Sequence, residues 1–116
     1  MRILVVEDDR RLLDTLLKGL KIKGHEVIGA SEFDKAIAMA MLHRPEVVLS
    51  DFELTNDSGL DLFNRIATLP ECKDSRFILM TGSLLEQSRA VERSANLKGF
   101  LRKPFQMASL MELLVA

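Results

Sequence analysis

Short apolar runs alternate along the chain with segments whose apolar residues recur at helical spacing. The apolar runs predict five strands, at residues 3–6, 25–30, 47–49, 77–81 and 99–102. The helical spacing predicts a helix after each strand, over residues 13–20, 33–41, 60–67, from 83 onward, and 107–114. Ser31 is the expected N-cap of the second helix, and Ser83 with Glu86 forms a capping-box pattern for the fourth.

Alternation of this kind predicts an α/β fold with a parallel sheet covered by helices on both faces. Five units are too few for an eight-stranded barrel, so we expect an open, doubly wound, five-stranded sheet with five helices. In such sheets the functional crevice lies beyond the carboxyl ends of the strands.

The composition limits the classes of function. The 116 residues suit one domain over 1–116, either complete or cut from a longer chain. The net charge of −1 argues against a domain that binds nucleic acid through its overall charge. The single cysteine, Cys72, excludes an internal disulfide and a cysteine-based zinc cluster. No apolar run approaches the ~18 residues of a membrane span, so a cytoplasmic location is expected.

Polar residues follow four of the five predicted strands. They are Glu7, Asp8 and Asp9 after the first strand, Asp51 at the end of the third, Thr81 and Gly82 at the fourth, and Lys103 and Pro104 after the fifth. An aspartate here often only caps a helix, and Asp8 or Asp9 has that alternative role. Three carboxylates at one edge, however, repel one another by roughly 4 kcal/mol per pair at ~4 Å and an effective dielectric of ~20. A compensating cation is therefore expected, and carboxylate ligands favour Mg²⁺.

An aspartate, a lysine, a hydroxyl and a divalent ion suit phosphoryl chemistry. A carboxylate can attack phosphorus to form an acyl phosphate. Such transfer depends mostly on positioning and on neutralising the phosphoryl oxygens, for which Mg²⁺, Lys103, Thr81 and backbone N–H groups near Gly82 are candidates. Asp51, at the end of an apolar strand, is the expected nucleophile.

These residues resemble the receiver domain of two-component response regulators. The resemblance covers nearly the whole chain and is carried by the Asp8–Asp9 pair, Asp51, Gly59, Thr81–Gly82 and the sequence KPF at 103–105. Each motif is weak alone, but their order in a chain of this length is specific. The resemblance implies a flavodoxin-like sheet of strand order 2-1-3-4-5.

The resemblance also implies a role for each matching position. Asp51 would be the phosphoacceptor, and Asp8 and Asp9 would hold Mg²⁺ together with Asp51 and the backbone carbonyl of Glu53. Lys103 would pair with the phosphoryl group, and the Lys103–Pro104 bond would be cis.

Two further positions would transmit the signal. Thr81 would move to bind the phosphoryl group, and Phe100 matches the rotating switch aromatic, although an ordinary core phenylalanine is an equal alternative. Three departures from the usual pattern stand out. Thr55 replaces a frequent proline, Phe100 carries no hydroxyl, and Glu53 with Ser83 occupies the positions that flank the route of the attacking water.

The resemblance implies a signalling switch that catalyses only its own phosphorylation and dephosphorylation. The phosphodonor would be a sensor histidine kinase or a histidine phosphotransfer domain, docking on the first helix near Leu12 and Leu13. Helix four, strand five and helix five would form the output face, for a homodimer or an effector. Its charged residues are Glu86, Arg89, Arg93, Lys98 and Arg102. Direct contact with nucleic acid or membrane is not expected of this domain.

Three other readings of the chain are open. "DFELT", residues 51–55, loosely resembles the signature of haloacid-dehalogenase-type phosphatases, but the acidic pair lies upstream and no cap domain is present. A flavodoxin-type flavin module would need a phosphate-binding first loop, whereas this loop is acidic, and the chain has no Trp or Tyr to stack on the flavin. A receiver-like domain that only docks partners is the third. Turnover of phosphate esters would identify the phosphatase, and a flavin colour would identify the flavin module. Failure to accept a phosphoryl group would identify the docking domain.

Overall fold

Five parallel strands form the central sheet of the computed structural model, which describes residues 1–54, 57–82 and 97–115. The strands are β1 (Arg2–Val6), β2 (Glu26–Ala30), β3 (Val47–Asp51), β6 (Arg76–Thr81) and β7 (Leu97–Arg102). Their order is β2-β1-β3-β6-β7, and each neighbouring pair is parallel. This confirms the predicted 2-1-3-4-5 order. Four strands extend one or two residues beyond the prediction at one end, and β2 begins one residue later than predicted.

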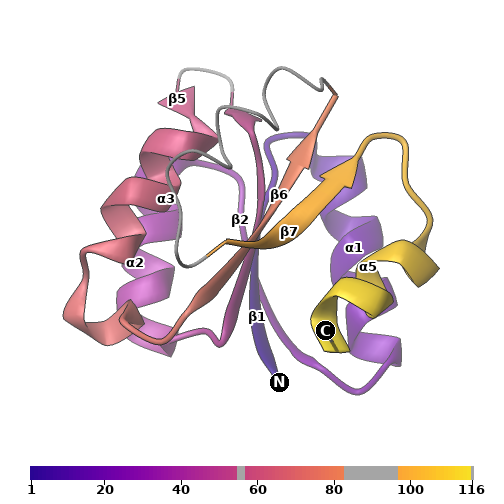
Figure 1. Ribbon diagram of the computed structural model, residues 1–116, viewed down its shortest axis with the longest axis horizontal. Helices are drawn as coiled ribbons and strands as arrows, with labels where there is room; N and C mark the ends of the chain where they lie inside the picture. Colours follow the sequence, from indigo (N-terminus) through magenta and orange to yellow (C-terminus); the bar gives the residue numbers. More distant parts are fainter. Residues whose placement is uncertain (55–56, 83–96, 116) are drawn as a thin grey trace.

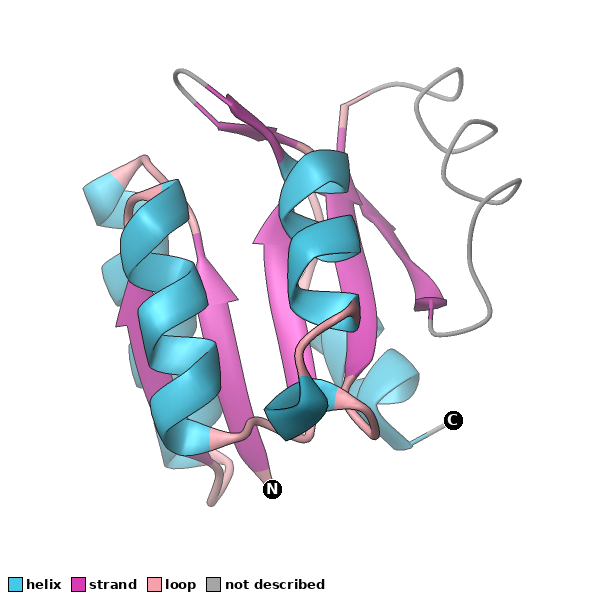
Figure 2. Ribbon diagram, turned by 90° about the vertical axis from the view of Figure 1, so that its left-hand side faces the viewer, coloured by secondary structure: helices cyan, strands magenta, loops and turns pink. Residues whose placement is uncertain are grey.

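Helices cover both faces of the sheet. Helices α1 (Arg10–Ile22) and α5 (Met107–Val115) lie on one face, while α2 (Phe33–His43) and α3 (Gly59–Ala67) lie on the other (Figure 1). Figure 2, viewed from the α2 and α3 side, shows these two helices lying along the strands. The predicted fourth helix, with Ser83, Glu86, Arg89 and Arg93, falls outside the described residues, as does Thr55. No helix of the described part of the chain is long and apolar enough to cross a bilayer.

Two apolar clusters fill the space between the sheet and its helices. Alternation along β1 sends Leu4 and Val6 into one cluster and Ile3 and Val5 into the other. The α2/α3 cluster includes Ala36, Ala40, Leu62, Phe63 and Ile66, and the α1/α5 cluster includes Leu13, Leu16, Leu20, Leu110 and Leu114. Because both faces are covered, the strands are apolar throughout, which explains the short apolar runs of the sequence.

Three local features differ from the predicted elements or add to them. Residues 52–58 include a two-stranded antiparallel hairpin of β4 (Glu53–Leu54) and β5 (Asp57–Ser58). Ser31, the predicted N-cap of the second helix, does not hold that position. Glu32 is the N-cap of α2, without a side-chain hydrogen bond, and the helix begins at Phe33. Cys72 lies in a short 3-10 helix, η1 (Pro70–Cys72), where its buried thiol donates to the Ala40 carbonyl at 3.5 Å.

The connections identify the functional edge of the sheet. Strand β1 leads into α1 on one face, whereas its neighbour β3 leads by way of the hairpin into α3 on the opposite face. This divergence is the topological switch point, and it opens a crevice beyond the carboxyl ends of β1 and β3.

Candidate functional site

Three carboxylates meet at this crevice. Glu7 and Asp8 follow β1 and Asp51 ends β3, and each offers an oxygen within 4.8 Å of the others. The parallel pairing of β1 and β3 brings them together, because Val6 lies opposite Ser50 in the register. The predicted convergence of acidic side chains on one edge is therefore present, but with Glu7 as a member.

Glu7 is the most buried of the three carboxylates. Only 1% of the residue is exposed. Its Oε1 accepts from the Asp9 backbone N–H at 3.2 Å, and its Oε2 accepts from Lys103 Nζ at 3.2 Å. Burial, together with the nearby charge of Asp51, raises the pKa of Glu7 to about 7, and the opposing effect of Lys103 does not offset the rise.

Lys103 joins the carboxylates from the far side of the crevice. Its Nζ donates to Asp51 Oδ2 at 3.0 Å as well as to Glu7. Its backbone N–H donates to the Thr81 carbonyl at 2.8 Å, and the Lys103–Pro104 peptide is cis. Burial alone would lower the pKa of Lys103, but hydrogen bonding and charge attraction from Asp51 and Glu7 outweigh it and raise that pKa. Lys103 therefore stays protonated and holds the two acidic residues together.

Asp51 is rigidly placed yet reachable. Its backbone is the last residue of β3, and the next amide, Phe52 N–H, donates to the Met80 carbonyl at 2.8 Å. Oδ1 accepts from the Glu53 backbone N–H at 3.3 Å, while Oδ2 faces Lys103. The side chain is 13% exposed, against 2% for Glu7. Of the two carboxylates bound by Lys103, Asp51 is the one open to a reactant.

Asp9, the second residue of the predicted acidic pair, has a different position. It is the N-cap of α1, and its Oδ1 accepts from the backbone N–H groups of Arg11 at 3.0 Å and Leu12 at 3.3 Å. The three-carboxylate cluster contains Glu7 in its place. The acidic pair at this crevice is thus Glu7–Asp8. The sequence carried a signal for this, since Asp9 lies a few residues before the apolar periodicity of the first helix, where an N-cap is expected.

The two predicted switch residues occupy adjacent strands. Thr81 ends β6 and is 1% exposed, and Phe100 is a half-buried residue of β7 that packs against the α2/α3 cluster. In the register, Phe100 lies opposite Leu79, two residues before Thr81. Side chains two residues apart on a strand share a face, so Thr81 and Phe100 point to the same side of the sheet.

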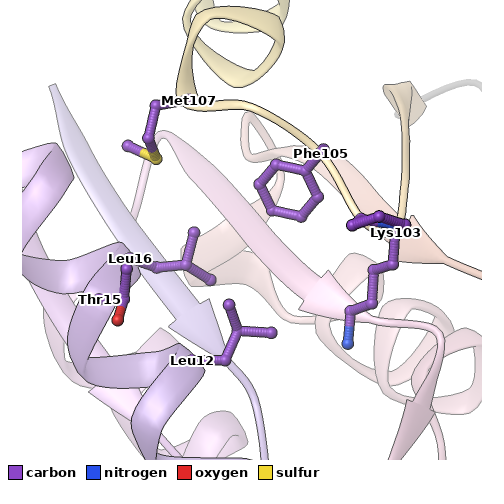
Figure 3. Close-up of a pocket in the computed structure, with 7 residues that line it drawn as sticks. Leu12, Thr15, Leu16, Lys103, Phe105 and Met107 are labelled. Carbon is purple, nitrogen blue, oxygen red and sulfur yellow. The ribbon is translucent and has the colours of Figure 1, made fainter.

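A mostly apolar hollow adjoins Lys103 on the α1 side of the crevice. It has a volume of about 410 Å³ and is lined by Leu12, Thr15, Leu16, Lys103, Pro104, Phe105 and Met107 (Figure 3). Leu12 and Leu16 point into it from α1, and the Phe105 ring faces them from the loop after β7. Leu13, expected beside Leu12 on a docking surface, instead packs in the core.

A doubly wound fold with an acidic crevice and a bridging lysine defines a class of phosphoryl-accepting signalling domains, and comparison with known proteins agrees. The family model of the response regulator receiver domain matches residues 3–115, so the chain belongs to this family. The transcriptional regulatory protein PdtaR of Mycobacterium tuberculosis is 28% identical over 113 residues, which cover 95% of this chain and 53% of that protein. This chain spans about half the length of such relatives.

Solved structures share the fold. A response regulator of Burkholderia pseudomallei, determined with a phosphorylated aspartic acid, calcium ion and citrate, is 30% identical with a TM-score of 0.86, covering 97% of this chain and 65% of that one. A CheY-like receiver domain of Methylobacillus flagellatus is 26% identical with a TM-score of 0.89, covering 99% and 96%. Because the chain belongs to the receiver-domain family, this assignment replaces the phosphatase and flavin-module alternatives.

Proposed function

We propose that Asp51 accepts a phosphoryl group from a phosphohistidine donor in a Mg²⁺-dependent reaction. The observation that carries this proposal is the geometry of Asp51, whose side chain at the strand end is 13% exposed while Lys103 Nζ holds its Oδ2 at 3.0 Å. The chemistry also fits the phosphorylated aspartic acid named for the Burkholderia relative. The donor would be a histidine kinase or a histidine phosphotransfer domain.

The donor set fits a magnesium ion. Three carboxylates offer oxygens within 4.8 Å of one another, and Lys103 Nζ contacts two of them, those of Glu7 and Asp51. Burial first, and then the charge of Asp51, raises the pKa of Glu7, and a cation among the carboxylates would oppose the second effect. Asp8, Asp51 and the backbone carbonyl of Glu53 would hold the ion, with Glu7 beside it. When bound, Mg²⁺ supplies charge neutralisation to the phosphoryl oxygens.

The chain's own residues position and balance the transfer. An oxygen of the Asp51 carboxylate forms the new O–P bond as the P–N bond to the donor imidazole breaks, and the electron pair of that bond stays on the imidazole nitrogen. Lys103 then exchanges part of its contact with Asp51 for a phosphoryl oxygen, which keeps its charge at the reacting group. Backbone N–H groups beyond β6 are further donors.

The signal would pass from the crevice to the β7 edge. Thr81 would turn toward the new charge, and Phe100, on the same side of the next strand, would fill the vacated space. The change would favour one of two pre-existing conformations. The face that includes Lys98 and Arg102 of β7 would then bind an effector or a second copy. The domain would act in the cytoplasm, without direct contact with nucleic acid.

Intact-mass measurement after incubation with acetyl phosphate and Mg²⁺ tests the proposal. We expect one added phosphoryl group on the wild type, none on Asp51→Asn, and strongly reduced addition in the presence of EDTA. Modification of the Asp51→Asn variant to the wild-type extent would assign the phosphoryl group to another residue. Continuous release of phosphate without a modified protein would instead indicate a phosphatase.

A further inference from the structure

Helix α2 is apolar on its outer side as well as on the side that faces the sheet. Asp34, Lys35 and His43 are its only polar residues. Ala36 and Ala40 are buried in the apolar cluster between the helix and the sheet. A helix that is apolar all round is normally covered on all sides. The described part of the chain covers only the inner side of α2, so its outer side is open to a partner.

The outer side of α2 presents a small apolar face made of Ala38, Met41 and Leu42. Met41 and Leu42 follow Ala38 by three and four residues, so the three side chains lie together along the helix. Met41 is 44% exposed and Leu42 is 69% exposed, and Ala38 is exposed as well. Helix α3 lies on the same face of the sheet (Figure 2), and its exposed residues among those described are Asp61, Asn64 and Arg65. The apolar face therefore belongs to α2 and not to this side of the molecule in general.

The first turn of α2 has a net negative charge. Glu32 is the N-cap and Asp34 lies in the first turn, and both are exposed carboxylates. Lys35, also exposed, supplies one opposing charge. The side chains of this turn therefore favour a basic surface opposite them.

The other end of the same helix has a net positive charge. Arg44 is the exposed C-cap. Arg2, at the start of β1, lies against this end, where its Nε donates to the His43 carbonyl and its Nη2 to the Arg44 carbonyl, each at 3.1 Å. Glu46 opposes these two guanidinium groups, and its Oε1 accepts from the Arg2 backbone N–H at 3.2 Å. An acidic end and a basic end thus flank the apolar face.

This layout is complementary to itself. A two-fold axis that passes through the middle of the apolar face, at Ala38, relates one α2 to a second, antiparallel α2. It brings Asp34 of each copy toward Arg44 of the other, and it opposes the two helix dipoles favourably. Lys35 of each copy then lies over Met41 of the other, where the alkyl part of the lysine covers apolar surface. The small side chain of Ala38 lets the two helices approach closely at the crossing.

We propose that the outer face of α2 binds the same face of a second copy of the chain, with the two α2 helices antiparallel. A contact made by one pair of helices is at the low end of interface sizes, so the dimer is weak and depends on concentration. Helix α2 packs on β1 and β2, whereas β7 lies at the opposite edge of the sheet. The pairing therefore leaves Asp51 and the β7 edge free in both copies, and it does not rest on the proposed function.

Sedimentation equilibrium of the protein between about 1 and 500 µM, without phosphodonor or Mg²⁺, tests the association. We expect the average mass to rise from that of one chain toward that of two. Leu42→Gln should raise the dissociation constant about tenfold, because it removes an apolar side chain from the contact without disturbing the core. Ile22→Gln changes a residue that is 82% exposed at the end of α1, on the other face of the sheet, and should associate as the wild type does.

A charge exchange tests the antiparallel arrangement. Asp34→Arg alone and Arg44→Asp alone should each weaken the dimer about tenfold, because each places like charges opposite one another. The double variant Asp34→Arg/Arg44→Asp restores opposite charges between the copies and should associate within about twofold of the wild type. Asp61→Arg makes the same change in the first turn of α3 and should leave the dimer intact.

A new cysteine locates the two-fold axis. Cys72 is buried, so mild oxidation should not link two wild-type chains. Ala38→Cys should form a covalent dimer, because the two Cβ atoms on either side of the axis lie within the range of a disulfide. Asp61→Cys, on α3, should stay monomeric under the same conditions.

Several outcomes would refute the pairing of α2 helices. These are a monomer over the whole concentration range, a dimer that Leu42→Gln leaves intact, and a charge exchange that restores nothing. A dimer lost only when Arg102 of β7 is replaced would assign association to the β7 edge instead. Acetyl phosphate should modify Asp51 equally in all these variants, so a failure of the proposed function would be seen separately.

Discussion

Replacing Glu7 by Gln should remove much of the pH dependence of stability of the metal-free protein. Glu7 is 1% exposed, and burial with the charge of Asp51 raises its pKa from 4.5 to about 7. Between these pH values the folded chain holds a proton on Glu7 that the unfolded chain has released. The free energy of unfolding therefore falls as pH rises through this interval, because the native state binds more protons.

The size of this effect follows from the shift. At about 1.4 kcal/mol for each pH unit, a rise from 4.5 to about 7 corresponds to roughly 3–4 kcal/mol as an upper limit. Glutamine keeps the shape and an oxygen for Lys103 but never ionises. At pH 8 the Glu7→Gln variant should thus be more stable than the wild type, by up to roughly 3–4 kcal/mol. At pH 5, close to the unfolded pKa, the two should differ by less than about 1 kcal/mol.

Urea unfolding at pH 5 and pH 8 in EDTA measures the difference, followed by far-UV circular dichroism because the chain has no Trp or Tyr. All other titratable groups are common to both proteins, so their contributions to the pH dependence cancel. Glu112→Gln, at an exposed position of α5, is the matched control and should behave as wild type. Equal pH slopes for wild type and Glu7→Gln would show that Glu7 is not protonated at pH 5 in the folded state.

Four further predictions concern the site. Lys103→Gln should lower the free energy of unfolding by about 2 kcal/mol, which is less than for a fully buried ion pair because the lysine side chain is 29% exposed. It should also slow modification by acetyl phosphate. Urea unfolding and intact mass measure the two effects, and unchanged values would contradict the bridging role of Lys103. Asp9→Ala should lower the free energy of unfolding by about 1 kcal/mol, because α1 loses its N-cap, and should still accept a phosphoryl group. Asp8→Ala should lose the Mg²⁺-dependent modification. The reverse pattern would indicate that Asp9 is the metal ligand. Thr81→Ala should still be phosphorylated but show smaller NMR shifts at β7, and wild-type shifts would refute the relay. Glu53→Ala should change the decay rate of the acyl phosphate, and an unchanged lifetime would exclude Glu53 from the path of water.

The fold was predictable because burial on both faces makes each strand a continuous apolar run. Residues 47–51 show this well, since Val47 to Ser50 are all buried and the run ends at a polar, partly buried Asp51. The meeting of Asp51 with Lys103 was predictable for a related reason. Parallel strands of one sheet end at a common edge, so residues 52 positions apart in sequence become neighbours.

The choice between Glu7, Asp8 and Asp9 was harder to predict. All three follow the same strand, and their charges are identical, so composition cannot separate them. Local geometry does: Asp9 has extended backbone angles at the N-cap and bonds the first turn of α1, which leaves Glu7 and Asp8 at the crevice. Leu12 and Leu13 pose the same problem, because adjacent residues on a helix point about 100° apart. One lines the hollow while the other is buried in the core.

The raised pKa of Glu7 comes first from burial and then from the charge of Asp51. Both effects disfavour the ionised form of Glu7 in the metal-free fold at neutral pH, and a cation that enters among the three carboxylates relieves them. Stability given up at the site is thereby linked to ion binding. On this argument Glu7→Gln should both stabilise the chain and weaken its response to Mg²⁺.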